Sequence, residues 1–292
     1  MNKEKITIAQ KAEILSQALP YIQKYHNKTV VIKYGGNAMI NEELKAAVMG
    51  DIVLLNCIGV RVVLVHGGGP ELSSMLKKVG KESKFINGLR YTDEETRDLA
   101  QMVFAGKLNK DLVAQINAQG GKAMGLCGVD GGMLTVKKKE SEIDYGFVGE
   151  MTAVDPTPIN TLLDAGYIPV ITCVGADENG VIYNVNADTM ACYVATAVQA
   201  ENIILMTDIR GLLEDKDDEN TLIPSVYTTE IPALIEKGIV AGGMIPKLQC
   251  CVDTIDSGVS KAAIIDGRIL HAILIEMLSD EGVGTMIYKG EE

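Results

Sequence analysis

Thr29-Val30-Val31-Ile32-Lys33-Tyr34-Gly35-Gly36 is a run of β-branched residues that ends in a glycine turn, and Arg61-Val62-Val63-Leu64-Val65-His66-Gly67-Gly68-Gly69 repeats the design. Such runs predict buried strands, because β-branched side chains pack well on a pleated surface that is covered on both faces. Glycine at the end of a run lets the backbone turn sharply. Each stretch therefore predicts a strand followed by a tight loop.

The same pattern continues along the chain, with helical periodicity between the strands. Further strand-like runs lie at 167–172, 202–207, 261–265 and 284–287, and helical patterns lie at 71–79, 93–104, 108–118 and 188–200. Buried strands that alternate with helices predict an α/β fold around a mostly parallel sheet. Thr92, followed three residues later by Glu95, predicts a capping box at the start of one helix. Ligands of such sheets bind at the carboxyl ends of the strands, where the glycine loops fall.

Composition excludes several classes of partner. The 292 residues include 27 Lys and Arg against 39 Asp and Glu, a net charge of −12, which argues against binding to nucleic acid or to an anionic membrane. No apolar run reaches the roughly 18 residues of a membrane span. We see no secretory signal and expect a cytoplasmic protein. The 6 Cys contain no C-x-x-C pair and are joined by only 3 His, so we expect reduced cysteines and no protein-held metal.

Two stretches suggest how the chain is divided. The polar stretch 175–180 follows one strand-like run and precedes a second series of strands and helices, so we expect two lobes, 26–180 and 181–292, that meet over a cleft. Ahead of them, residues 1–25 form a separate segment. Apolar residues recur there at helical spacing: Ile8, Ala12, Leu15, Leu19 and Ile22. Pro20 should bend this amphipathic helix, which either packs on its own domain or docks on a neighbouring subunit.

Two familiar phosphate-binding signatures are missing. No G-x-x-x-x-G-K-[ST] string occurs, and no G-x-G-x-x-G follows a strand and opens a helix, so a P-loop and a dinucleotide fingerprint are both excluded. The glycine loops at 33–37 and 66–70 remain. Because glycine allows a ligand to approach the backbone closely, successive N–H groups in such loops can converge on phosphate oxygens. The pair of loops predicts an anion site.

Two lysines are candidates for neutralising that anion. Lys33 ends an apolar strand, and its ammonium group either reaches solvent or points into the cleft beside the glycine loop. Lys247 follows Pro246, which we predict at the first position of a helix that runs to about residue 257. A lysine at a helix N-terminus opposes the helix dipole by about 0.3–1 kcal/mol. A bound anion would reverse that penalty, which makes Lys247 the sharper candidate.

Three further polar residues fit the same cleft. Asp188 precedes a helix that we predict from about Thr189, and it either caps that helix or holds the cleft lysines in place. Asn184 is a candidate donor to a ligand carbonyl or carboxylate. Arg90, in a loop before a predicted helix, is suited to binding a carboxylate through two parallel hydrogen bonds.

We interpret His66 as structural. The one Asp-x-Asp string, Asp215-Lys216-Asp217, lies in a stretch that we interpret as a solvated turn, so any Mg²⁺ should arrive on a nucleotide and be held mainly by its phosphates.

A set of strings resembles the acetylglutamate kinase family of the amino acid kinase superfamily. The strings follow the family's order from about residue 29 to 288: Val31 to Met39, Val65 to Pro70, Asn87-Gly88-Leu89-Arg90, Asn184-Val185-Asn186-Ala187-Asp188, Thr207 to Gly211 and Gly243 to Lys247. The start with strand, lysine and glycine is common to the whole superfamily. The strings around Arg90 and Asn184 point to acetylglutamate.

The resemblance implies a three-layer α/β/α sandwich and phosphoryl transfer from ATP, with Mg²⁺ carried by the nucleotide, to the side-chain carboxylate of N-acetyl-L-glutamate, an early step of arginine biosynthesis. Lys33 and Lys247 would stabilise the transferring group, and Asp188 would orient them. The remaining roles implied are N–H donors at Gly35, Gly36, Gly68 and Gly69, substrate binding by Gly68, Gly69, Arg90 and Asn184, and nucleotide binding by Gly35, Gly36 and Asp208.

The N-terminal helix is similar to that of the arginine-inhibited, hexameric members, in which helices of adjacent dimers interlace. The resemblance thus implies a homohexamer and feedback inhibition by L-arginine, with His271 and Glu276 as effector contacts. Removal of residues 1–25 should abolish the inhibition.

Rival functions remain open. A sister kinase acting on glutamate, aspartate, carbamate or UMP would share the fold, and Arg90 with Asn184 favours an acylated amino acid with a free α-carboxylate. A catalytically dead arginine sensor would not require Lys33, Lys247 and Asp188. An NAD-dependent oxidoreductase lacks its fingerprint here.

Overall fold

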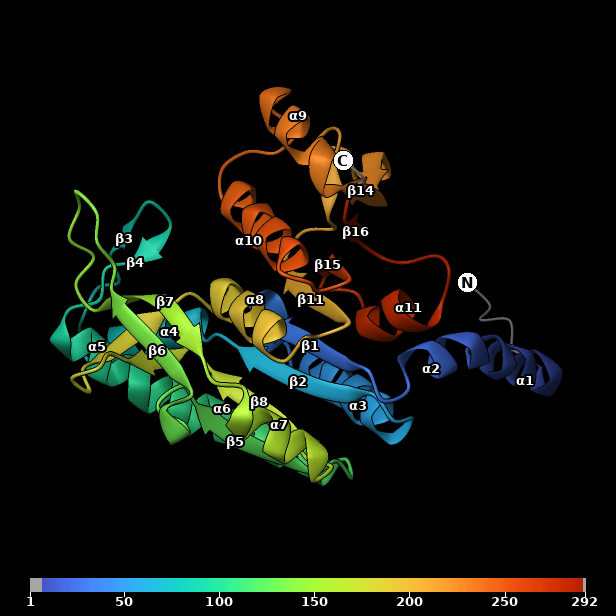
Figure 1. The fold of residues 1–292 in the computed structure, drawn as a ribbon, viewed down its shortest axis with the longest axis horizontal. Helices are drawn as coiled ribbons and strands as arrows, with labels where there is room; N and C mark the ends of the chain where they lie inside the picture. Colours follow the sequence, from blue (N-terminus) through green and yellow to red (C-terminus); the bar gives the residue numbers. More distant parts are fainter. Residues whose placement is uncertain (1–6, 291–292) are drawn as a thin grey trace.

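A central sheet of eight strands organises the molecule (Figure 1). The computed structural model describes residues 7–290, except for the side chain of Asn37. The order across the sheet is β14-β16-β15-β11-β1-β2-β8-β5. The bounds are β1 (Thr29–Tyr34), β2 (Arg61–His66), β5 (Ala123–Cys127), β8 (Ile168–Thr172), β11 (Asn202–Thr207), β14 (Ser225–Tyr227), β15 (Lys261–Asp266) and β16 (Thr285–Tyr288). Neighbouring strands are parallel except β15 and β16.

Every strand that the sequence predicted is confirmed, and the strands it missed in this sheet are β5 and β14. They lie at its two ends. β5 contains no β-branched residue and β14 has three residues, so neither carries the pattern that marks a buried strand.

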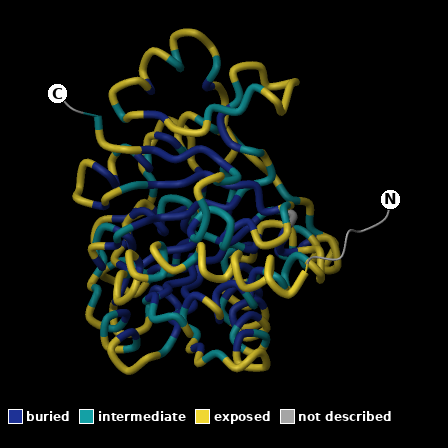
Figure 2. Tube along the Cα trace, turned by 90° about the vertical axis from the view of Figure 1, so that its right-hand side faces the viewer, coloured by how far each residue is buried: buried dark blue, intermediate teal, exposed yellow. Residues whose placement is uncertain are grey.

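Helices cover both faces of the sheet, which confirms the α/β/α sandwich. One face is covered by α7 (Thr157–Asp164), α8 (Ala187–Ala197) and α10 (Met244–Asp256), and the other by α3 (Glu42–Cys57), α6 (Asn109–Ala118) and α11 (Ala272–Leu278). Buried residues accordingly gather inside the body and exposed ones on its outer turns (Figure 2). No helix within residues 7–290 combines the length and the apolar character needed to cross a bilayer.

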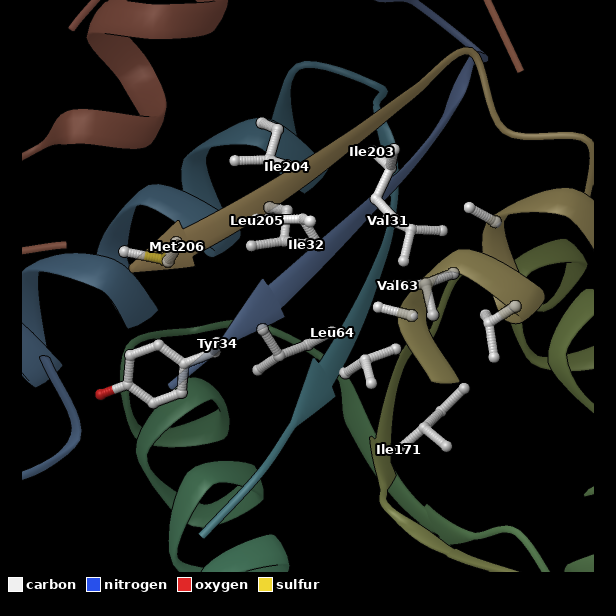
Figure 3. Close-up of a cluster of buried hydrophobic side chains, with 14 of the residues drawn as sticks. Val31, Ile32, Tyr34, Val63, Leu64, Ile171, Ile203, Ile204, Leu205 and Met206 are labelled. Atoms are coloured by element: carbon white, nitrogen blue, oxygen red, sulfur yellow. The ribbon is translucent and has the colours of Figure 1, made fainter. Parts of the chain in front are cut away.

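The core shown in Figure 3 lies along four neighbouring strands of the sheet. Ile32, Leu64, Ile171 and Ile204 come from β1, β2, β8 and β11, and all are fully buried (Figure 3). Both faces of these strands are therefore apolar, and polar side chains can project only where the strands end.

A smaller sheet lies beside the main one. Its strands β6 (Leu134–Lys138), β7 (Val148–Val154), β9 (Val174–Ala176) and β10 (Ile182–Val185) close on themselves. The polar stretch 175–180 includes the turn between β9 and β10, which pair antiparallel. Short hairpins complete the strands: β3 (Phe85–Ile86) with β4 (Leu89–Arg90), and β12 (Leu212–Leu213) with β13 (Leu222–Ile223).

Residues 94–118 follow one helical path. It runs from α5 (Glu94–Gln101) through a π-helical segment, Met102–Leu108, into α6. The predicted capping box at Thr92 is wrong, because Asp93 is the N-cap and its carboxylate accepts a hydrogen bond from the N–H of Thr96 at 2.9 Å. The Thr92 hydroxyl is buried and donates to the carbonyl of Arg90 instead.

The N-terminal helix is bent where Pro20 predicted. α1 (Ile8–Gln17) and α2 (Leu19–Tyr25) are separated at Ala18, and α1 projects from the body (Figure 1). No residue of α1 is buried, whereas Tyr25 at the end of α2 is. The remaining helices are α4 (Gly69–Lys78) and α9 (Ile231–Glu236).

Replacing Leu64 by Ala tests the core. Leu64 is fully buried in β2, so the change leaves a cavity and should lower the free energy of unfolding by about 2–5 kcal/mol. Leu270, 43% exposed, serves as the matched control, and Leu270→Ala should cost much less. Urea unfolding of the two variants measures the difference; equal losses would contradict this placement of the core.

Candidate active site

The site begins at the carboxyl end of β1. β1 lies between β2 and β11, and residues before 173 form the sheet on one side of it while residues after 201 form the other. Such a point, where the strand order changes direction, leaves a crevice at the strand ends. Lys33 is the last but one residue of β1 and its side chain reaches this crevice.

Two lysines meet one carboxylate there. The Lys33 Nζ lies 2.9 Å from Oδ1 of Asp188, and the Lys247 Nζ donates a hydrogen bond to Oδ2. The side chains are 13%, 12% and 20% exposed for Lys33, Lys247 and Asp188, so water screens the cluster only in part. Burial alone would raise the pKa of Asp188, but the two ammonium groups outweigh it and lower that pKa to about 2. The cluster thus carries a net charge of +1 at neutral pH.

Asp188 is free to pair because another residue caps its helix. The side-chain oxygen of Asn186 accepts hydrogen bonds from the N–H groups of Asp188 and Thr189, both at 3.0 Å. Of the two roles left open for Asp188, the N-cap is therefore wrong and the pairing with the cleft lysines is the one observed. The helix α8 starts at Ala187, two residues before the predicted start.

Lys247 projects from the first turns of α10. The helix starts at Met244, two residues earlier than predicted, so Pro246 is its third residue. Among the described residues no side chain caps α10, and the positive end of its dipole adds to the charge of Lys247. An anion placed here would meet both.

The first glycine loop lies against charged side chains. A Cβ on Gly35 would come within 2.7 Å of the Lys33 Nζ, and a Cβ on Gly36 would overlap the carboxylate of Asp208. Gly36 also has φ +69°, a conformation that favours glycine. Both glycines are therefore required for Lys33 and Asp208 to approach the loop.

Arg90 is buried and rigidly held. Its guanidinium donates to the hydroxyl of Ser83 at 2.7 Å and to the hydroxyl of Ser73 and the carbonyl of Gly69, both at 2.9 Å, and it stacks over Phe85. Burial lowers the pKa of Arg90. None of the ion pairs among residues 7–290 includes it, so its charge is available to an anionic ligand.

Arg90 shares a cavity of about 170 Å³ with the second glycine loop. Gly68, Gly69 and Asn184 line it too, and the Asn184 amide donates to the hydroxyl of Thr92 at 3.3 Å. A Cβ on Gly68 would collide with Leu108 and Phe104, so only glycine fits there. Gly68 precedes α4, whose N-terminus carries no side-chain cap within the described chain.

A second cavity of about 400 Å³ continues from the first. Asp188 and Lys247 line it, and both cavities are bordered by Val148, Val185 and Asn186. Val148 of β7 and Val185 of β10 bring the small sheet to this shared border. A ligand held by Arg90 can thus extend to Lys247.

A third cavity of about 570 Å³ lies over the other half of the sheet. It is lined by the β11–β12 loop from Ile209, by Gly238, and by Met244 at the start of α10. Asp208 is the first residue of this loop. Both the loop and α10 therefore connect this cavity to the lysine cluster.

His66 is structural, as predicted. Its ring is fully buried, with Nδ1 2.8 Å from the carbonyl of Gly67 and Nε2 3.2 Å from the amide of Asn109. Burial lowers the pKa of His66 to about 4, so it stays neutral at physiological pH. Within residues 7–290, no cluster of His, Cys, Asp or Glu is suited to hold a metal.

The residues proposed from the sequence thus lie together at the strand ends. The sequence did not point to Ser73 or Ser83, whose hydroxyls carry no local pattern and become relevant only through the groups they contact. It singled out Thr92 only as a helix cap. Asn186 could have been found, since an Asn just before a helical pattern is a typical N-cap.

The chain resembles known proteins over nearly its whole length. The model of the Amino acid kinase family matches residues 28–266. An acetylglutamate kinase of Brachyspira hyodysenteriae is 55% identical over 286 residues, 98% of this chain and 99% of that protein. An acetylglutamate kinase of Clostridium kluyveri is 53% identical over 277 residues, 95% and 98% of the two chains.

Solved structures agree with the fold. The N-acetylglutamate synthase from Neisseria gonorrhoeae complexed with coenzyme A and N-acetyl-glutamate superimposes with a TM-score of 0.85 at 25% identity, and this chain spans 96% of its own length but only 64% of that chain. The carbamate kinase from Giardia lamblia bound to AMP-PNP gives a TM-score of 0.65 at 18% identity and shares the fold. On the family match and these full-length relatives, the chain belongs to the amino acid kinase family and, within it, to the acetylglutamate kinases.

Proposed function

We propose that this chain transfers the γ-phosphoryl group of ATP to the side-chain carboxylate of N-acetyl-L-glutamate, forming N-acetylglutamyl 5-phosphate and ADP for arginine biosynthesis. The observation that carries the proposal is the Lys33–Asp188–Lys247 cluster, of which Asp188 and Lys247 line the cavity that borders the Arg90 cavity. The full-length similarity to acetylglutamate kinases supports the choice of substrate.

The acceptor needs no general base. A glutamate side chain has a pKa of about 4.3, so it is a carboxylate at neutral pH and can attack phosphorus directly. The O–P bond to the carboxylate forms as the bond between phosphorus and the β–γ bridging oxygen breaks. Catalysis then consists of aligning the two oxygens and stabilising the charge that spreads over the transferring group.

Lys33 and Lys247 are placed to stabilise that charge. They approach from β1 and α10, and Asp188 keeps the two ammonium groups together against their mutual repulsion. Because Asp188 balances only one of the two charges, the second remains for the phosphoryl oxygens. The N–H groups of Gly35 and Gly36 would add donors on the Lys33 side.

The Arg90 cavity fits the rest of acetylglutamate. In this arrangement Arg90 binds the α-carboxylate, and the amide of Asn184, with the N–H groups of Gly68 and Gly69, contacts the acetylamide. Since Ser73 and Ser83 fix the guanidinium in advance, little side-chain entropy is lost on binding.

The nucleotide would occupy the cavity beside Ile209 and Met244, with Asp208 at its edge. Mg²⁺ would arrive with ATP and neutralise phosphate charge. The donor set fits a metal held by the nucleotide, because the Asp188 carboxylate is paired with both lysines and no cluster of His, Cys, Asp or Glu suited to a metal lies within residues 7–290.

ATP consumption with N-acetyl-L-glutamate, glutamate, aspartate, carbamate and UMP is the direct test of substrate. Turnover with acetylglutamate alone supports the proposal. Turnover with another acceptor would assign the chain to a sister activity, and arginine binding without turnover would favour a sensor.

Replacing Lys247 by Ala should lower kcat roughly 10²–10³-fold, the usual loss when one donor to a developing charge is removed. Steady-state kinetics measure it. Lys78, an exposed residue of α4, is the control, and Lys78→Ala should keep full activity. A Lys247→Ala enzyme with unchanged kcat would remove Lys247 from the mechanism.

Replacing Arg90 by Lys should act mainly on substrate binding. Lysine lacks the planar pair of donors, so KM for acetylglutamate should rise roughly ten- to a hundredfold. This rise corresponds to the loss of about 1.5–3 kcal/mol, the usual contribution of a hydrogen bond to a charged group. KM for ATP should not change. A rise in both constants would indicate general damage to the fold.

We further propose that L-arginine inhibits the enzyme and that it assembles as a hexamer, a trimer of dimers, through α1. Apolar side chains of α1 are exposed in the single chain: Ile8 is 88% and Leu15 74% exposed. α2 contacts α11, the helix that follows His271 and contains Glu276. The carboxylate of Glu276 accepts a hydrogen bond from the N–H of Val283, and His271 lies 2.7 Å from Asp51.

Removal of residues 1–18 should abolish arginine inhibition and convert hexamers to dimers. This cut is safer than the removal of 1–25 because it keeps the buried Tyr25 and the hydrogen bond from Tyr21 to Asp280. Light scattering gives the mass, and arginine titration of the kinase reaction gives the inhibition. Full arginine sensitivity in the shortened enzyme would refute the role of α1.

A further inference from the structure

Two cysteines from different helices meet behind the lysine cluster. Cys192 lies on α8 and Cys250 on α10, both line one cavity between these helices, and each thiol shifts the pKa of the other. The Cys250 sulfur also lies 3.9 Å from the hydroxyl of Thr189. All six cysteines of the chain are free.

The pair stands one helical turn from the residues that hold the phosphoryl position. Cys192 follows Asp188 by four residues on α8, and Cys250 follows Lys247 by three on α10. Residues spaced by three or four share one face of a helix. The two helix faces joined by the ion pair of Asp188 and Lys247 are therefore the faces that carry the thiols.

Small molecules can reach this pair. Cys250 is partly exposed and borders the cavity of about 400 Å³ that contains Asp188 and Lys247. Cys250 and Cys192 together also line a separate cavity of about 340 Å³ between α8 and α10, with Tyr193, Thr196 and Asp253. The cavity of about 340 Å³ is mostly apolar, contains none of the proposed substrate contacts and is not used by the kinase mechanism.

The surroundings shift the pKa values of the two thiols in opposite directions. The hydrogen bond from Cys192, aided by Thr189, lowers the pKa of Cys250 to about 7, against the opposing effect of burial. The same contact raises the pKa of Cys192. Cys250 is therefore the more acidic thiol of the pair, and Cys192 the less acidic one.

We propose that Cys250 and Cys192 form a peroxide-reactive modification site that reversibly links α8 to α10. The Cys250 thiolate attacks one oxygen of hydrogen peroxide, the O–O bond breaks, and hydroxide leaves to take up a proton as water, so that Cys250 becomes a sulfenic acid. The Cys192 sulfur then attacks the Cys250 sulfur, losing its proton, and the S–O bond breaks with release of a second water. Two thiols are oxidised by two electrons, and one peroxide is reduced to two waters. A dithiol reductant restores both thiols.

The link should slow the kinase, a consequence that rests on the proposed function. A disulfide brings two sulfurs closer than a hydrogen bond does. Its formation draws α8 and α10 together one turn from Asp188 and Lys247, and small displacements of groups aligned for reaction reduce rates strongly. We expect at least a fivefold lower kcat in the oxidised enzyme, with recovery in dithiothreitol.

Mass spectrometry of the full chain, treated with hydrogen peroxide and then digested without reduction, tests the link independently of activity. The expected product is one intramolecular disulfide, a loss of about 2 Da, in a peptide pair that joins Cys192 to Cys250. Free thiols at both positions after treatment, or a disulfide that joins other cysteines, would overturn the proposal.

Two variants sharpen the test. Cys192→Ser removes the resolving thiol, so Cys250 should keep an oxygen that dimedone traps. Cys57 is exposed and lacks the paired thiol, so Cys57→Ser should leave the Cys192–Cys250 link unchanged. Loss of the link in Cys57→Ser would assign the chemistry to Cys57 instead.

The kinase assay separates the two proposals. A reduced enzyme without kinase activity would contradict the proposed function but not the disulfide read by mass. A disulfide that forms fully while kcat is unchanged would overturn the coupling to catalysis.

Discussion

The position of β1 between β2 and β11 is the constraint on which the site depends. The chain builds the sheet outward from β1 in two directions, so loops from both halves of the sequence end at its carboxyl edge. Lys33 comes from β1, the second glycine loop from β2, and Asp208 from the end of β11. Apolar packing on both faces of these strands leaves that edge as the place where polar groups converge (Figure 3).

Charge is concentrated at this edge in an otherwise acidic protein. A chain with a net charge of −12 repels anions over most of its surface. Lys33, Lys247 and Arg90, with the N-termini of α4 and α10, create local positive potential that the partly buried setting preserves from screening. Asp188 limits that potential, since without a carboxylate the two lysines would repel one another in the empty cleft.

The contact between α8 and α10 serves both the packing of these helices on the sheet and the proposed chemistry. Both helices cover the same face of the sheet, and each contributes one member of the Asp188–Lys247 ion pair and one cysteine a turn later. Any change in their spacing at the thiols is passed to the ion pair, because a helix turn is stiff over that distance. The proposed redox link and the proposed kinase mechanism therefore depend on one helix–helix contact.

By itself, the sequence determined the α/β class, the glycine loops and six strands of the main sheet: β1, β2, β8, β11, β15 and β16. Local residue patterns suffice for these features, because a buried strand needs a run of apolar residues and a tight turn needs glycine. It also indicated Lys33, Lys247, Asp188 and Arg90, whose motifs resemble those of a known family. Only the tertiary structure decided that Asn186 rather than Asp188 caps α8, that Ser73 and Ser83 hold Arg90, and that Cys192 meets Cys250. The contacts of Arg90 and of the two cysteines join residues that lie 7 to 58 positions apart. The cap of α8 falls to Asn186 because the side chain of Asp188 pairs with Lys247, 59 positions away. Local periodicity contains no information on such pairings, since they arise when the sheet brings separate elements to one edge.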